Sequence, residues 1–73
     1  MDIIAFTIRL KQAMKDQSFT AESLAEAADI PAASLRGWTC ARSMPRLDAV
    51  VKMADALNVS IDWLTGRKEN REI

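Results

Sequence analysis

The stretch TAESLAEAADIPAASLRGWTC, residues Thr20–Cys40, decides the fold because it holds two short helical patterns separated by a sharp break. Thr20 is a good N-cap residue for the first of them. That helix should end at Asp29, since aspartate tolerates the left-handed conformation and Pro31 disfavours helical geometry at the residue before it. The pattern therefore predicts a helix over residues 21–28, followed by a tight turn.

The second pattern begins at Pro31 and predicts a helix over residues 32–40. A proline can occupy the first helical position because its missing N–H would have no partner there. Leu35 and Trp38 lie three residues apart, so we expect both to face the core. The opposite face then carries Ala33, Arg36, Gly37 and Cys40. Only one of these side chains is long and polar, so the outward face is nearly bare.

Further helical patterns lie on both sides of this pair. Residues 3–17 repeat apolar side chains every three or four positions, which predicts a first helix. A fourth helix over residues 47–57 should end at Asn58, and Ser60 should cap a short fifth helix over residues 61–65. The fourth helix is expected to bury Leu47, Val50, Val51, Ala54 and Leu57. We therefore predict an all-α domain.

Length and composition limit the classes of protein. The chain has 73 residues and no histidine, and it shows neither a CxxC pair nor paired carboxylates. We therefore predict no catalytic site, no metal and no cofactor, and we see no sign of a small-molecule ligand. One domain is expected over residues 1–66, closed by Gly66, with a charged, frayed tail or the start of a linker over residues 67–73.

The N-terminal sequence MDIIAFTIRLK has acidic Asp2 where a secretory signal would be basic. No apolar run approaches the roughly 18 residues that a membrane span needs. The single cysteine, Cys40, cannot form an internal disulfide, and an idle thiol is favoured over a redox switch there. We expect a soluble, cytoplasmic protein without a membrane partner.

Charge is unevenly distributed although ten basic and ten acidic residues cancel. Residues 17–29 hold three acidic side chains and no basic one. Residues 30–46 hold Arg36, Arg42 and Arg46 and no acidic side chain. A local positive patch on the second of two short helices is typical of contact with the DNA backbone.

Two short helices joined by a tight turn, with small Ala25 at their crossing, are the layout of a helix-turn-helix. From Thr20 to Pro45 the chain resembles the lambda-repressor-like helix-turn-helix domain of phage repressors and related bacterial regulators. LDAVVKMADALNVSIDWLTG, residues 47–66, resembles the ending common in phage repressor DNA-binding domains. The resemblance covers about residues 4–66. It implies a compact five-helix domain that acts as a sequence-specific transcriptional regulator, of the phage or prophage repressor type, on double-stranded operator DNA.

The chain also departs from that family. Family members often place polar base-reading side chains at the positions of Ala32, Ala33 and Gly37, and they often pair an arginine with a glutamate at the positions of Met14 and Thr39. The chain therefore has few side chains that could read bases directly. A second interpretation stays open: a protein-interaction module that has kept this fold with weakened base readout.

Arg36 is the main candidate for reading a base, because its guanidinium fits the N7 and O6 acceptors of guanine. Arg42 and Arg46 lie beside the loop where the family touches phosphate, so we expect them to contact the backbone, although each can also be a solvated surface charge. The predicted DNA-binding set is Thr20, Ala32, Ala33, Ser34, Arg36, Gly37, Arg42 and Arg46. Within it, Thr20 is equally well explained by capping.

So few cations should bind DNA weakly in a single copy, which favours a homodimer on a two-fold symmetric operator. We expect dimer contacts from the last helix and its edge, through Ile61, Trp63 or Leu64, together with the tail. GRKENREI, residues 66–73, also resembles the point where many relatives enter a linker to a C-terminal domain, so a following domain is an open alternative.

Overall fold

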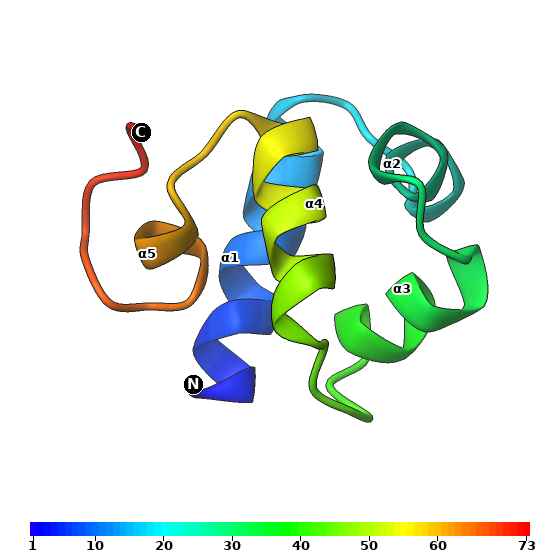
Figure 1. Ribbon diagram of the computed structural model, residues 1–73, viewed down its shortest axis with the longest axis horizontal. Helices are drawn as coiled ribbons and strands as arrows, with labels where there is room; N and C mark the ends of the chain where they lie inside the picture. Colours follow the sequence, from blue (N-terminus) through cyan, green and yellow to red (C-terminus); the bar gives the residue numbers. More distant parts are fainter.

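The structure, a computed structural model, describes residues 1–73 and contains five α-helices and no strand. The helices are α1 (Ile3–Asp16), α2 (Ala21–Ala28), α3 (Ala32–Thr39), α4 (Leu47–Leu57) and α5 (Ile61–Leu64). Figure 1 shows α2 and α3 on one side of α1 and α4, with α5 and the C-terminal segment on the other side. The predicted all-α, five-helix class is confirmed.

A single apolar core ties these helices together. Leu10 of α1, Leu24 of α2 and Leu35 of α3 are all fully buried, and burial of one such side chain contributes about 1.5–3 kcal/mol. Trp38 is 9% exposed, so the prediction that Leu35 and Trp38 face the core is confirmed. These two side chains anchor α3 and turn its opposite face outward.

Two of the predictions for the core were wrong for α4. Leu47 is 73% exposed and Val51 is only partly buried, whereas Met53 is fully buried. Helical side chains lean toward the N-terminus of their helix, so the side chain of the first residue overhangs the end of α4 instead of packing on the core. The inward stripe of this helix consists of Val50, Met53, Ala54 and Leu57.

The ends of α2 form as the sequence predicts. Thr20 Oγ1 accepts a hydrogen bond from Ser23 N (3.0 Å), and Ser23 Oγ accepts one from Thr20 N (2.9 Å), which makes a reciprocal capping box. Asp29 takes the left-handed conformation with φ 57°. The N–H of Ile30 then donates to the carbonyl of Ala25 at 2.9 Å, and the helix ends. Both the cap and the stop are confirmed.

Helix α3 begins at Ala32 as predicted, with Pro31 as its N-cap, so the proline does not itself occupy the first helical position. Its φ of −58° suits a helix, but its ψ of 133° is extended, so the helical turn begins one residue later. The carbonyl of Pro31 accepts hydrogen bonds from the N–H groups of Ser34 (3.1 Å) and Leu35 (3.2 Å). At the other end α3 stops at Thr39, and Cys40 is its C-cap instead of its last residue.

The C-terminal segment curves around α5 (Figure 1) and is hydrogen-bonded to the domain, unlike a frayed tail, while its role as the start of a linker stays a prediction. The carbonyl of Arg71 accepts a hydrogen bond from Ser60 N at 2.8 Å. The Arg71 guanidinium lies 4.4 Å from the centroid of the Trp63 ring and donates to the carboxylate of Asp16 at 3.2 Å. From α1, Arg9 donates to the carbonyl of Lys68 at 2.7 Å. Cation–π stacking and these long-range contacts fix a segment that has no sequence periodicity.

Candidate nucleic-acid interface

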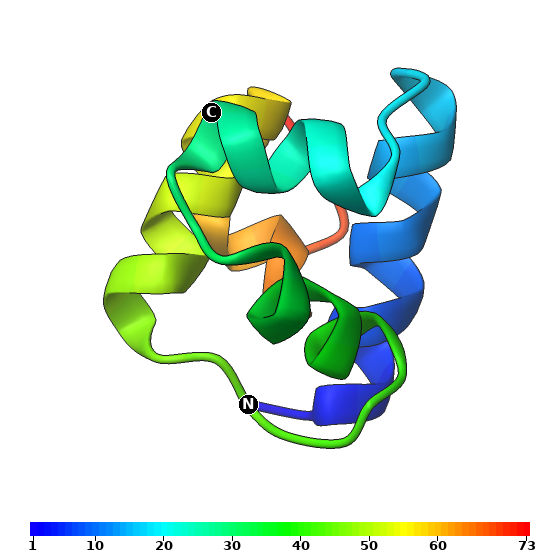
Figure 2. The same ribbon diagram turned by 90° about the vertical axis from the view of Figure 1, so that its right-hand side faces the viewer.

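The outward face of α3 is exposed and carries small side chains, as predicted. Figure 2 shows α3 and α2 together on the side of the molecule that faces the viewer. Ala33, Ser34 and Cys40 are exposed, and Gly37 is partly buried. A Cβ at Gly37 would meet only Ser43 Oγ at 3.7 Å, so packing does not require a glycine there. The smoothness of this face lets the α3 backbone approach a flat or grooved partner closely.

The side chain of Arg36 extends from α3 to α2. Its guanidinium donates to the carboxylate of Glu22, and the two side chains are 56% and 60% exposed. Sequence reasoning missed this partner because the dipole of α2 already explains an acidic residue in its first turn. The pair depends on the packing of α2 against α3, which brings Glu22 and Arg36 together.

Arg42 and Arg46 form no ion pair with a carboxylate. Both are exposed, one just beyond α3 and the other at the N-cap of α4. Arg46 makes no side-chain capping bond, so its charge is free for another contact. These two residues are the positive groups that remain available beside the bare face of α3.

Two other predicted residues are less available than the arginines. Ala32 is partly buried against the core, so its methyl group offers little surface to a partner. The hydroxyl of Thr20 serves the α2 cap, although the residue is exposed. Contact between either residue and DNA stays a prediction.

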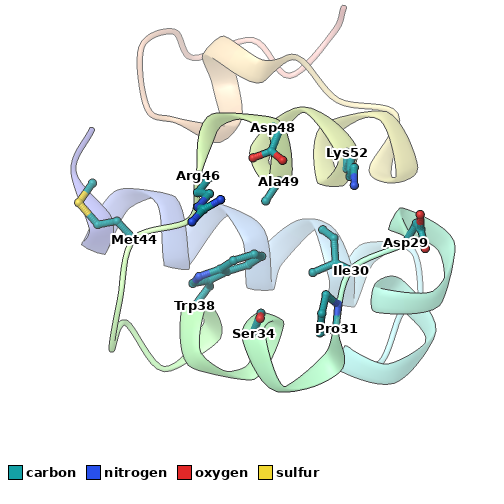
Figure 3. A pocket seen from close by; sticks show the side chains of 10 residues that line it. All are labelled: Asp29, Ile30, Pro31, Ser34, Trp38, Met44, Arg46, Asp48, Ala49 and Lys52. Atoms are coloured by element: carbon teal, nitrogen blue, oxygen red, sulfur yellow. The ribbon is translucent and has the colours of Figure 1, made fainter.

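A hollow of about 310 Å³ lies between α3, the following loop and the start of α4. Figure 3 shows Trp38 within it, with Ser34 on α3 and Arg46 at the start of α4 on either side. The hollow brings these two predicted residues together and adds Lys52, which sequence reasoning had not singled out. Asp29 and Asp48 also line it, so its charge is mixed.

Other kinds of site have no support in the structure. No group of three or more histidine, cysteine, aspartate or glutamate side chains is arranged to hold a metal ion. None of the five helices has the length and apolar character that crossing a bilayer requires. The exposed face of α3 is flanked by Arg42 and Arg46, which are both exposed.

A protein-family model with the description Helix-turn-helix matches residues 10–64, from the middle of α1 to the end of α5. The chain belongs to the helix-turn-helix family. The match confirms the predicted lambda-repressor-like resemblance, and it supports a DNA-binding regulator of the helix-turn-helix class. Neither a curated protein nor a solved structure matches the chain.

Within the helix-turn-helix family, α2 and α3 are the two helices that give the motif its name. In this arrangement the second helix enters the major groove and the first crosses the DNA backbone. The family match spans all eight predicted contact residues without distinguishing those that touch DNA. That assignment depends on exposure and charge, which favour Arg36, Arg42, Arg46 and Ser34 over Ala32.

Proposed function

We propose that this chain is a sequence-specific transcriptional regulator, of the phage or prophage repressor type, that binds operator DNA as a homodimer with α3 in the major groove. The observation that carries the proposal is the exposed face of α3, where small side chains surround Arg36. Small side chains allow the helix to lie deep in the groove, and arginine is the side chain best suited to read guanine.

The charges around α3 support the same orientation. Arg42 and Arg46 are unpaired and lie after and beside α3, where they can reach phosphates on either side of the groove. The acidic residues of α2 weaken this attraction, and the net charge of the chain is zero. A single copy therefore has little electrostatic affinity, and two copies on one operator supply the remainder.

The exposure of side chains near the C-terminus limits which of them could contact a second copy. Trp63 is 5% exposed and Leu64 is fully buried, so neither is free for the dimer contact that the sequence suggested. Ile61 is 36% exposed, and it lines a hollow of about 390 Å³ together with Met1 and Leu47. We propose that any dimer contact at this end of the molecule uses Ile61 and Leu47.

A second candidate function is a protein-interaction module on the same fold. The ion pair between Arg36 and Glu22 favours it, because this pair occupies the only long polar side chain on the outward face of α3. In this alternative the bare face of α3 packs on a protein partner. DNA binding would then be weak and independent of sequence.

Selection of bound duplexes from a random pool separates the two functions. The regulator should enrich a motif with two half-sites about one helical turn apart, and footprinting should show both half-sites protected. A pool without enrichment at low salt would favour the interaction module. Protection of one half-site by a stable monomer would contradict the homodimer and leave sequence-specific binding intact.

A further inference from the structure

Glu22 forms an ion pair with Arg36, which is the one cation on the outward face of α3. Three arginines lie between residues 30 and 46, and Arg36 is the only one of them that is paired with a carboxylate. Glu22 belongs to α2, the helix that crosses the DNA backbone in this arrangement. The pair therefore joins the residue expected to read a base to a helix expected to lie against phosphate.

This pairing changes what DNA meets when it approaches α3. A guanidinium bound to a carboxylate offers little net charge to a phosphate, and the carboxylate itself repels the backbone. Both side chains are more than half exposed, so the pair is screened by water and can be exchanged for another partner. A ligand that displaces Glu22 must therefore offer the guanidinium acceptors at least as good as the carboxylate.

A guanine edge is such a partner. Its N7 and O6 atoms accept two hydrogen bonds from one guanidinium, and because the base carries no net charge the Glu22 carboxylate does not repel it as it repels a phosphate. We propose that Glu22 is a specificity-determining residue, whose carboxylate competes with the DNA backbone for Arg36 and so reserves this arginine for guanine. The inference rests on the proposed function and adds to it a residue outside α3.

The other acidic residue of α2, Glu26, differs from Glu22 in having no cationic partner. Glu26 lies one turn after Glu22 in the same helix and is exposed. If Glu22 acted only through its negative charge, Glu26 would act in the same way. The pair with Arg36 is the feature that distinguishes the two glutamates.

The variant Glu22→Gln tests the inference, because it removes the charge and keeps the shape of the side chain. Its affinity is measured for the duplex enriched by selection and for a shuffled duplex of the same composition, at several salt concentrations. We expect binding to the shuffled duplex to tighten by on the order of three- to tenfold and binding to the preferred duplex to change less. The salt slope on the shuffled duplex should become steeper by about one unit per subunit.

Two controls distinguish loss of the contact with Arg36 from a general change in charge, and a folding check accompanies them. Glu26→Gln removes an equal charge without a cationic partner, so it should shift both duplexes by the same small factor. Glu22→Gln in an Arg36→Ala background should leave the ratio of the two affinities unchanged, because the competition no longer exists. Circular dichroism of each variant checks that the domain is folded.

Three results would overturn the inference while the proposed function stands. They are an equal effect of Glu22→Gln and Glu26→Gln, an unchanged ratio of the two affinities, and weaker binding of Glu22→Gln to the preferred duplex. The last of these would make Glu22 a group that orients Arg36. A wild-type protein that prefers no duplex over its shuffled form would overturn the proposed function itself and the inference with it.

Discussion

Ala41 has a φ of 57°, in the left-handed region where an alanine side chain is strained by roughly 1–2 kcal/mol. The residue follows α3 and its C-cap Cys40 and directs the chain into the loop toward α4. Ala41→Gly should therefore raise the free energy of unfolding by about 0.5–1 kcal/mol, since glycine takes this conformation readily but has more entropy to lose. Urea unfolding measures the change.

The control for this variant is Ala27→Gly, an exposed position inside α2 with ordinary helical geometry. There the same substitution should lower the free energy of unfolding by about 1 kcal/mol. Opposite signs at the two positions would confirm that the backbone conformation at Ala41 decides the effect. A loss of stability at both positions would refute it.

Arg36 and Arg42 differ in what they should contribute to DNA binding. Arg36→Ala should cost about 1–3 kcal/mol on the preferred duplex and relax the choice of one base pair per half-site. Arg42→Ala should weaken all sequences about equally and flatten the salt slope by roughly one unit per subunit, because it loses a phosphate contact. Equal losses on preferred and shuffled duplexes for Arg36→Ala would make it a backbone contact, with specificity arising from DNA shape.

At the scale of elements, the C-terminal segment contributes to stability through one side chain. The Arg71 guanidinium stacks on Trp63 and pairs with Asp16, whereas the hydrogen bond from Ser60 N uses the Arg71 carbonyl, which an alanine keeps. Arg71→Ala should lower the free energy of unfolding by about 1–2 kcal/mol. Arg67→Ala is the matched control, because Arg67 lies in the same segment and forms no ion pair. Similar effects of the two variants would rule out this anchoring role.

The helix-turn-helix elements were predictable because their limits depend on local chemistry. Thr20 and Asp29 mark the ends of α2 through a capping box and a left-handed residue, and both are visible in a short window of sequence. The anchoring by Arg71 was not predictable, since its partners lie 8 to 55 residues away in the chain. The pair of Arg36 with Glu22 likewise depends on how α2 and α3 cross.

The candidate site also has features that the sequence predicted and features that it could not predict. The amphipathic pattern of α3 predicted which residues face outward, because Leu35 and Trp38 are a clear core stripe. Periodicity could not reveal that Arg36 is paired, that Ala32 packs on the core, or that Lys52 joins Arg46 around one hollow. These facts arise from contacts between helices, on which a single sequence without aligned relatives carries no direct signal.

For the whole molecule, zero net charge makes the salt dependence of binding informative. Arg42, Arg46 and one or two lysines per subunit can meet phosphates, so a dimer should neutralise roughly 6–8 of them and show a log–log salt slope of about −5 to −7. The slope is obtained from affinities for the preferred duplex between low and moderate salt. A slope shallower than about −2 would mean that phosphate contacts contribute little. Affinity would then have to come from uncharged contacts of α3, and the interaction module would be favoured over the regulator.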